Sequence, residues 1–473
     1  MRAFQETELS YSQARSHHSI GHITDSRFFG DGFATPEART IFSDTTRLQR
    51  WLDVEVALAE AQADLGMIPA KAAKTLAVTA DLEAFDLDAV AQDMKLTGHS
   101  LVPLLRAWQT LCGPEAAQYL HFGATTQDIQ DTAQSLEIVH ALDLIERALV
   151  DVAVELRRLA KENRDVVAIA RTHGQHALPT TIGLKFAVWL DETLRNLERL
   201  RACRKTVGVA QLFGGVGTMA AFGHHGETLL ENFARRLGLH APSTAWHTSR
   251  DRVVEFLSVL ALVSGGLANV ANEIVQLSKS DIGELKEGFQ KGAVGSSTMP
   301  HKSNPENSER IVLLARLVKS AATLGFDALC NEHERDYRSV RLEWVAITDC
   351  VLHTAAALSL MTQVLNGLVV NRERIAQNVN GAAQSICSEA LMFFLGSRLG
   401  KDNAYHVVYK ASFSDPSSER SLVDRLMDDP LVAETFERTA LAAAVCPENY
   451  VGDAGRIVDK VTGHAQRALN LKI

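Results

Sequence analysis

The sequence has little of several features that define simple classes of protein. Aromatic residues make up only 6% of its 473 positions, and acidic residues outnumber basic ones, giving a formal net charge of −9. A nucleic-acid-binding protein needs a basic face, so this balance argues against one, although a local patch can exist within an acidic total. No run of uncharged apolar residues approaches the roughly 18 that a membrane span requires. We therefore expect neither a nucleic-acid partner nor a membrane.

The six cysteines are scattered and form no Cys-x-x-Cys pair or other metal-ligand spacing. This pattern is typical of free thiols in a reducing compartment rather than of a disulfide framework. The polar segment from Met1 to Ser26 contains no apolar signal core. We therefore expect a cytoplasmic protein.

Apolar residues recur at alternating spacings of three and four, which indicates amphipathic helices. One row covers residues 138–159 and another 253–277, and neither contains proline. An earlier helical pattern begins near Thr46 and breaks at Gly66 and Pro69. Long helices with one apolar seam bury it by packing together, so we expect an all-α protein built on a long-helix bundle.

The length of the chain predicts two or three domains, with the bundle ending near Leu368 and a smaller helical region following it. Helical seams alone are also typical of a scaffold protein without catalytic activity. The polar segments between the seams favour an enzyme.

The first polar segment is Gly123–Asp128, just before a long helical row. Asp128 or Thr126 is explained equally well as a plain helix N-cap. Adjacent threonines at a helix start also make a carboxylate site, because hydroxyl and backbone N–H groups converge there.

Two further segments combine charged residues and histidines. Residues 171–176 contain two histidines, an arginine and a threonine, and they open another helix-rich stretch through Pro179. Residues 331–336 form a dense charged cluster, which is typical of a solvated face.

The remaining segment, residues 291–304, interrupts two helical stretches with a polar loop rich in glycine. Residues 295–304 match the signature G-S-S-x-M-P-x-K-x-N of the aspartase/fumarase superfamily at every specified position. The segments at 123–128 and 171–176 resemble the other two conserved regions of that superfamily. The resemblance covers nearly the entire chain from Ile41 and is nearest to the branch of adenylosuccinate lyase and bacterial 3-carboxy-cis,cis-muconate cycloisomerase.

This resemblance implies three helical domains, with predicted boundaries at 1–115, 116–368 and 369–473. It also implies a homotetramer around a central helical bundle, with active sites built from three different chains. The substrate would be a small polycarboxylate, and the chemistry needs no metal and no organic cofactor.

The resemblance also assigns the roles of individual residues. Removing a proton next to a carboxylate creates a dianion, which needs fixed positive charge and hydrogen-bond donors. The predicted substrate ligands for this purpose are Thr125, Thr126, Gln127, Thr172, Lys302 and Asn304. Ser296 is the expected base, and His173 is the expected general acid, paired with Glu309.

Different segments resemble different members of the branch. His99 and residues 171–175 favour a carbon–nitrogen lyase like adenylosuccinate lyase. Residues 98–104, 246–252 and 339–344 are closer to the cycloisomerases. Val340 and Trp344 stand where the lyases hold a nucleotide phosphate, and neither side chain can do so.

We therefore expect β-elimination on a succinate-type substrate, with C–N cleavage of an N-substituted aspartate smaller than adenylosuccinate and release of fumarate. Arg338 and Arg341 are candidates for binding an additional carboxylate, although exposed helical arginines are common. One alternative is lactone formation from carboxymuconate. A catalytically silent scaffold is a remote alternative, because Ser296, Lys302 and His173 are all present.

Overall fold

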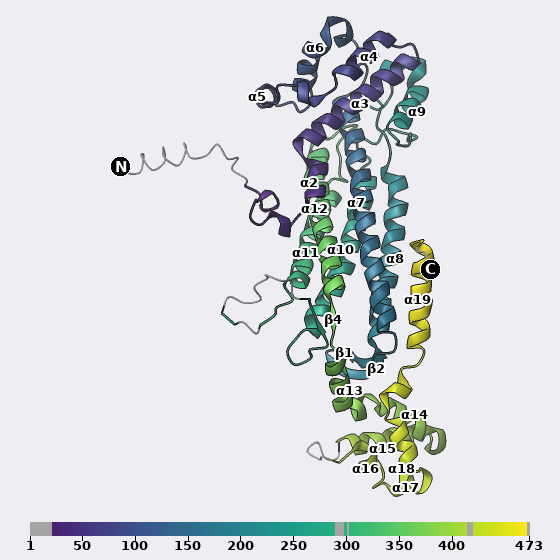
Figure 1. Ribbon diagram of the computed structural model, residues 1–473. Coiled ribbons are helices and arrows are strands. Elements are labelled where there is room, and N and C mark those ends of the chain that lie inside the picture. Colours follow the sequence, from purple (N-terminus) through teal and green to yellow (C-terminus); the bar gives the residue numbers. More distant parts are fainter. Residues whose placement is uncertain (1–20, 289–297, 300–301, 414–419, 471–473) are drawn as a thin grey trace. The chain divides into compact units, whose positions relative to one another are not determined.

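The computed structural model describes residues 21–288, 298–299, 302–413 and 420–470. Within these ranges the chain is mostly helical, and its few strands form two separate antiparallel pairs (Figure 1). The predicted all-α fold is confirmed.

The longest helices carry the apolar rows that the sequence predicts. They are α7 (Thr126–Glu162), α8 (Ile182–Val207), α10 (Asp251–Leu277), α11 (Glu306–Asp327) and α12 (Tyr337–Gly367). The residues that recur at spacings of three and four in these two rows, from Ile138 to Leu159 and from Val253 to Leu277, are buried. The last of these helices, α12, ends one residue before Leu368, where the sequence predicts the end of the bundle.

The chain divides into two compact units. Unit 1 comprises Met1–Ala148, Glu198–Gly265 and Leu313–Ser359, and unit 2 comprises Leu149–Leu197, Gly266–Val312 and Leu360–Ile473. The five long helices have residues in both units, so the division falls within helices and not at residues 115 and 368. The division into three domains stays a prediction.

Unit 1 has its main core among short helices near the N-terminal end of the chain. Its short elements are η1 (Ile23–Asp25), η2 (Gly30–Gly32), α2 (Pro36–Phe42), α3 (Asp44–Asp64), α4 (Ala70–Thr79), η3 (Leu82–Ala84), α5 (Leu87–Thr97), α6 (Val102–Ala117), η4 (Ala220–His225) and α9 (Gly226–Arg236). The helices α3, α4, α6 and α9 pack together (Figure 1). Between α3 and α4 the helical pattern breaks at Gly66 and Pro69, as predicted.

Unit 2 combines small helices with the strands. Its elements are β1 (Val167–Thr172), β2 (Gln175–Thr181), β3 (Leu285–Lys286), β4 (Val369–Val370), α13 (Arg372–Ile386), α14 (Ser388–Leu399), α15 (Lys401–Phe413), α16 (Leu422–Leu426), α17 (Pro430–Thr435), α18 (Arg438–Ala444), η5 (Pro447–Tyr450) and α19 (Ala454–Ala468). A separate apolar cluster is formed mainly by α14 to α18.

The hairpin β1–β2 corrects one expectation, because residues 171–179 form strands and not the beginning of a helix. His173 and Gly174 connect the two strands with φ values of +53° and +75°. Positive φ at both central residues is the requirement of a type I′ turn, which matches the twist of two antiparallel strands. The polar composition of this segment does not by itself indicate a hairpin turn.

Two of the long helices are long and apolar enough to cross a membrane by length and composition alone. They are Asp251–Leu277 and Tyr337–Gly367, and 61% and 72% of their most apolar windows are buried inside the structure. Core helices of folded proteins pass the same test when they are mostly buried. All six cysteines fall within the described residues and are free, as predicted.

Candidate active site

The segment Gly123–Asp128 forms the beginning of α7 in unit 1. The buried Asp128 carboxylate accepts a hydrogen bond from the Thr125 backbone N–H at 3.0 Å. It accepts three more, at 2.9–3.1 Å, from Phe213 N, Gly214 N and His247 Nε2. A carboxylate in the first turn that binds back to the N-cap N–H is one half of a capping box, so Asp128 fixes where the helix begins. Thr125 and Thr126 are thereby held where helix N–H groups favour a bound carboxylate.

A cavity of about 400 Å³ lies in unit 1 beside this helix start. It is lined by the α5–α6 connection, the first turns of α7 and residues 335–341. Four of the predicted site residues meet there: His99, Thr126, Gln127 and Arg341. Among the described residues that line it are two arginines and no aspartate or glutamate. The cavity is therefore suited to an anion, although the chain as a whole is acidic.

Arg335 is a site residue that the sequence did not single out. Its Nη1 donates to Thr125 Oγ1 at 2.7 Å, and its Nε donates to Gln127 Oε1 at 3.3 Å. It belongs to the charged cluster at 331–336, which the composition explained as a solvated face. The cluster was the only signal, because the contact joins residues 210 positions apart.

His99 is held by the backbone of the next helix. Its Nδ1 accepts hydrogen bonds from Leu101 N at 3.3 Å and Val102 N at 3.1 Å, at the beginning of α6. A ring nitrogen that accepts carries no proton, so in the neutral ring the proton is on Nε2. This tautomer presents a hydrogen-bond donor, and His99 lines the cavity.

Gln127 is held in position by a buried ionic cluster. Its Nε2 donates to Asp131 Oδ2 at 3.0 Å and to the His247 carbonyl at 2.9 Å. Asp131 in turn accepts two hydrogen bonds from Arg250, at 2.9 and 3.0 Å, and Arg250 also binds Glu343. These three ionic side chains are fully buried, with one cation between two carboxylates. Burial lowers the pKa of Arg250, but both carboxylates raise it above the ordinary value.

The two candidate arginines at the beginning of α12 have different surroundings. Arg338 forms ion pairs with Asp336 and with Glu332, and its hydrogen bonds hold the pKa of the Asp336 carboxyl well below the usual range. Arg341 lines the cavity and donates to Ser100 Oγ at 3.1 Å. Only Arg341 of the two lies in the cavity lining.

Thr172 and His173 lie in unit 2, at the exposed end of the β1–β2 hairpin. The hairpin is anchored by Arg171, whose Nη1 and Nη2 bind the buried Glu284 carboxylate at 3.0 and 2.6 Å. Asn378 on α13 donates to the same carboxylate at 2.9 Å. A bidentate arginine–carboxylate pair fixes orientation as well as distance, so Arg171 holds the strand next to the turn that contains His173.

The signature loop also belongs to unit 2. Ser296 lies outside the described residues, whereas Lys302 and Asn304 immediately precede α11. The helix start is held by Glu287, whose Oε1 accepts from Ser308 N at 2.6 Å and from the Ser308 hydroxyl at 2.5 Å. Lys302 is exposed.

The predicted residues thus fall into two groups. Unit 1 contains His99, Thr125, Thr126, Gln127, Arg338 and Arg341; unit 2 contains Thr172, His173, Lys302, Asn304 and Glu309. Within the described part of the chain, no hydrogen bond or ion pair joins His173 to Glu309, so their pairing stays a prediction.

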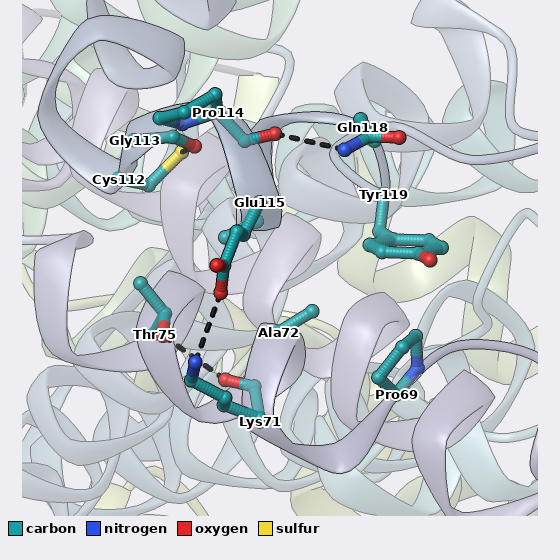
Figure 2. Close-up of a pocket in the computed structure, with 11 residues that line it drawn as sticks. Pro69, Lys71, Ala72, Thr75, Cys112, Gly113, Pro114, Glu115, Gln118 and Tyr119 are labelled. Atoms are coloured by element: carbon teal, nitrogen blue, oxygen red, sulfur yellow. Dashed lines mark hydrogen bonds and ion pairs between the residues drawn. The ribbon is translucent and has the colours of Figure 1, made fainter.

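A larger hollow, of about 490 Å³, lies between α4 and the end of α6 (Figure 2). Lys71 and Glu115 point toward one another there and form an ion pair at 2.9 Å, with both side chains 83% exposed. None of the predicted site residues lines this hollow. Its one lysine is already paired, so the cavity beside α7 is the better candidate.

The chain is similar to known proteins over most of its length. Residues 32–319 match the family described as "Lyase", and residues 385–461 match "Adenylosuccinate lyase C-terminus". The chain is 41% identical over 445 residues to N-acetyl-S-(2-succino)cysteine lyase of Dickeya dadantii, covering 94% of this chain and 98% of the relative. It is 38% identical to adenylosuccinate lyase of Methanothermobacter thermautotrophicus, covering 92% and 98%.

A solved structure extends the similarity to the fold. The 3-carboxy-cis,cis-muconate lactonizing enzyme of Pseudomonas putida superimposes with a TM-score of 0.87 at 34% identity, covering 94% of this chain and 100% of that one. The chain belongs to the fumarate lyase superfamily and is an enzyme of that family.

Proposed function

We propose that the enzyme catalyses β-elimination on an S-substituted succinate, breaking a carbon–sulfur bond and releasing fumarate and a thiol. The main support for a polyanionic substrate is the cavity beside α7. This cavity has two guanidinium groups and, among its described lining residues, no carboxylate. The relative from Dickeya dadantii is named for a thioether of succinate, and this supports sulfur as the leaving atom. The sequence pattern had favoured nitrogen.

In the first step a base removes a proton from the carbon next to one carboxylate of the succinate. Ser296 is the proposed base. The electron pair of the broken C–H bond becomes the new C=C bond, while the pair of the C–S bond leaves with sulfur. Lys302 and Asn304, with Thr125, Thr126 and Thr172, bind the carboxylates where the extra negative charge develops.

The leaving group decides how much proton transfer is needed. A thiol has a pKa of about 8.5, so it departs readily as a thiolate, whereas an amine leaves only when it is protonated. His173, oriented by Glu309, is proposed to protonate the departing sulfur, so that the product is the thiol. His99, with its proton on Nε2, is proposed to donate a hydrogen bond to the substrate.

The size of the leaving group is limited by Trp344 and Val340. The Trp344 ring lies 6.2 Å from the Trp51 ring, and Arg47 and Arg341 lie over it at 5.2 and 3.8 Å from its centroid. Val340 is 6% exposed. Val340 has no hydrogen-bond donor and Trp344 has only its indole N–H, so neither can hold a phosphate as a serine or an arginine does. This supports a substrate smaller than adenylosuccinate.

A second candidate is C–N cleavage of an N-substituted aspartate. It is favoured by His99, by residues 171–175 and by the similarity to adenylosuccinate lyase. Lactone formation is favoured by residues 339–344 and by the structural similarity to the lactonizing enzyme.

The test is an assay for fumarate with a panel of substrates. The panel contains N-acetyl-S-(2-succino)cysteine, S-(2-succino)cysteine, adenylosuccinate, argininosuccinate and 3-carboxy-cis,cis-muconate. We expect fumarate and free thiol from a succinate thioether, and a loss of about 10²–10⁴-fold in kcat for Ser296→Ala. Ser303→Ala removes the same hydroxyl group from a variable position of the same loop and serves as the matched control.

Each outcome assigns one reaction. Fumarate from an aspartate derivative but from no thioether would establish the C–N lyase instead. Loss of muconate absorbance without fumarate would establish the cycloisomerase.

A further inference from the structure

Arg341 lies against two aromatic rings at the beginning of α12. Its guanidinium carbon is 3.8 Å from the centroid of the Trp344 ring and 4.6 Å from that of Tyr337. Stacking on aromatic faces fixes the plane of a guanidinium group and leaves its N–H donors directed outward at the edge. Arg341 is therefore oriented before any ligand binds.

The hydrogen bonding of Arg341 is incomplete. Its Nη2 donates to Ser100 Oγ at 3.1 Å, whereas its buried Nε has no hydrogen-bond partner. Among the described residues, no carboxylate lies within ion-pair distance of Arg341. A buried donor without a partner is unfavourable, so this group is suited to bind an acceptor from a ligand.

Ser100 is prepared for the same acceptor. Its Oγ accepts hydrogen bonds from Gln130 Nε2 at 2.7 Å and from Arg341 Nη2. A hydroxyl oxygen has two acceptor positions and one O–H donor, so both acceptor positions are used. Within the described chain the Ser100 O–H has no acceptor, and Ser100 and Arg341 line the same cavity.

The cavity contains a second, separately held guanidinium. Arg335 is held by Thr125 and Gln127 at the beginning of α7, where the carboxylates of the succinate are proposed to bind. Arg341 is held by Ser100 of the α5–α6 connection instead. Two cations with different partners fit a ligand that carries an anionic group beyond the succinate itself.

We propose that Arg341 and Ser100 bind a carboxylate carried by the leaving group, so that the enzyme selects acidic thiols such as an N-acylated amino acid. This inference rests on the proposed function, because it concerns the specificity of the same cavity. It also separates Arg341 from Arg338, whose ion pairs with Asp336 and Glu332 already satisfy it.

The experiment compares two thioethers that differ only in this carboxylate: N-acetyl-S-(2-succino)cysteine and N-acetyl-S-(2-succino)cysteamine. For the wild-type enzyme we expect kcat/KM to be about 10- to 100-fold higher for the cysteine compound, as for a charge-assisted hydrogen bond. In Arg341→Gln this ratio should fall close to one, because only the cysteine compound loses an interaction. Activity on the cysteamine compound shows at the same time that the variant is folded.

Arg106→Gln is the matched control, because it removes one positive charge from the surface of α6, where Arg106 pairs with Asp93. Its ratio should equal that of the wild type. If Arg341→Gln is inactive on both compounds, Ser100→Ala decides, with an expected fall in the ratio and an unchanged rate on the cysteamine compound. An unchanged ratio in Ser100→Ala would then overturn the proposal.

The carboxylate specificity and the proposed elimination can be disproved separately. A wild-type enzyme that cleaves both thioethers equally well would overturn this inference and leave the proposed function standing. If the selectivity is lost in Arg338→Gln and kept in Arg341→Gln, Arg338 binds the carboxylate and the proposal for Arg341 is wrong. A wild-type enzyme that cleaves neither thioether would overturn the proposed function and this inference together.

Discussion

At the scale of single residues, the candidate site depends on side chains that substrate never touches. Arg250 lies with Asp131 and Glu343 in a buried cluster, and Asp131 binds Gln127 at the cavity wall. Such a cluster contributes little net stability compared with apolar packing, but removing one partner leaves charge unpaired in the interior.

We expect Arg250→Met to lower the free energy of unfolding by about 3–5 kcal/mol, because two buried carboxylates lose the cation that lies between them. Denaturant unfolding of the variant and the wild type measures this difference. Arg236→Met removes an arginine paired with Glu60 and Asp64 at the surface, and it should change stability by less than about 1 kcal/mol. Equal effects of the two substitutions would contradict this account.

A second residue predicts a dependence on pH. Burial lowers the pKa of His121, but the hydrogen bond and the charge interaction with Glu55 together raise the pKa by more than burial lowers it. The net shift of the pKa is therefore upward. The protonated ring therefore stabilises the folded state fully below the unfolded pKa of about 6.5, and this stabilisation is lost as pH rises through the folded pKa.

The thermal stability of the wild type relative to His121→Gln should thus be greatest in mildly acidic solution and decline at alkaline pH. Melting curves of both proteins across this range measure the change. A constant difference between them would show that His121 is not protonated in the folded state.

At the scale of elements, the hairpin β1–β2 is the part of the site with the strictest backbone requirement. Gly174 has a φ of +75°, which residues other than glycine rarely adopt. A Cβ added at this position would have no atom within 4 Å. Any effect of a substitution there comes from backbone strain and not from crowding.

We expect Gly174→Ala to destabilise the turn by roughly 1–2 kcal/mol and to reduce kcat by displacing His173. Asparagine tolerates positive φ, so Gly174→Asn is the matched control and should keep most of the activity. Steady-state kinetics of the two variants decide, and similar losses in both would point to a contact of the added side chain with substrate.

At the scale of the whole molecule, several large apolar side chains are exposed on the long helices of the single chain. Leu313 and Leu317 on α11 are 45% and 36% exposed and lie four residues apart, on one face of the helix. Exposed apolar groups on long helices are typical of an interface between subunits. This supports the proposed homotetramer with shared active sites.

The double variant Leu313→Glu/Leu317→Glu should dissociate the tetramer and lose activity, because charges placed in an apolar interface cannot be solvated. Light scattering on a sizing column, combined with the fumarate assay, measures both effects. Lys319→Glu changes charge at an exposed site of the same helix and should leave the tetramer intact. A wild-type monomer with full activity would contradict the shared-site proposal.

The sequence by itself determined the helices and the family. The apolar rows at 138–159 and 253–277 predict long helices because helical periodicity is a local property of the chain, and both rows are buried. The signature at 295–304 identified the superfamily because its residue types and spacing are specific. The exact start of α7 was not predicted, because the helix begins at Thr126 and Asp128 acts from within the first turn instead of as the N-cap.

Only the tertiary structure decided which polar side chains meet. Arg335 binds Thr125 across 210 positions of sequence, and Arg341 binds Ser100 across 241, while Arg338 on the same helix pairs locally with Asp336. The hairpin that carries His173 was likewise hidden, because its turn depends on backbone angles that composition does not reveal. Contacts between distant segments depend on how the helices pack, and no local pattern of residues contains that information.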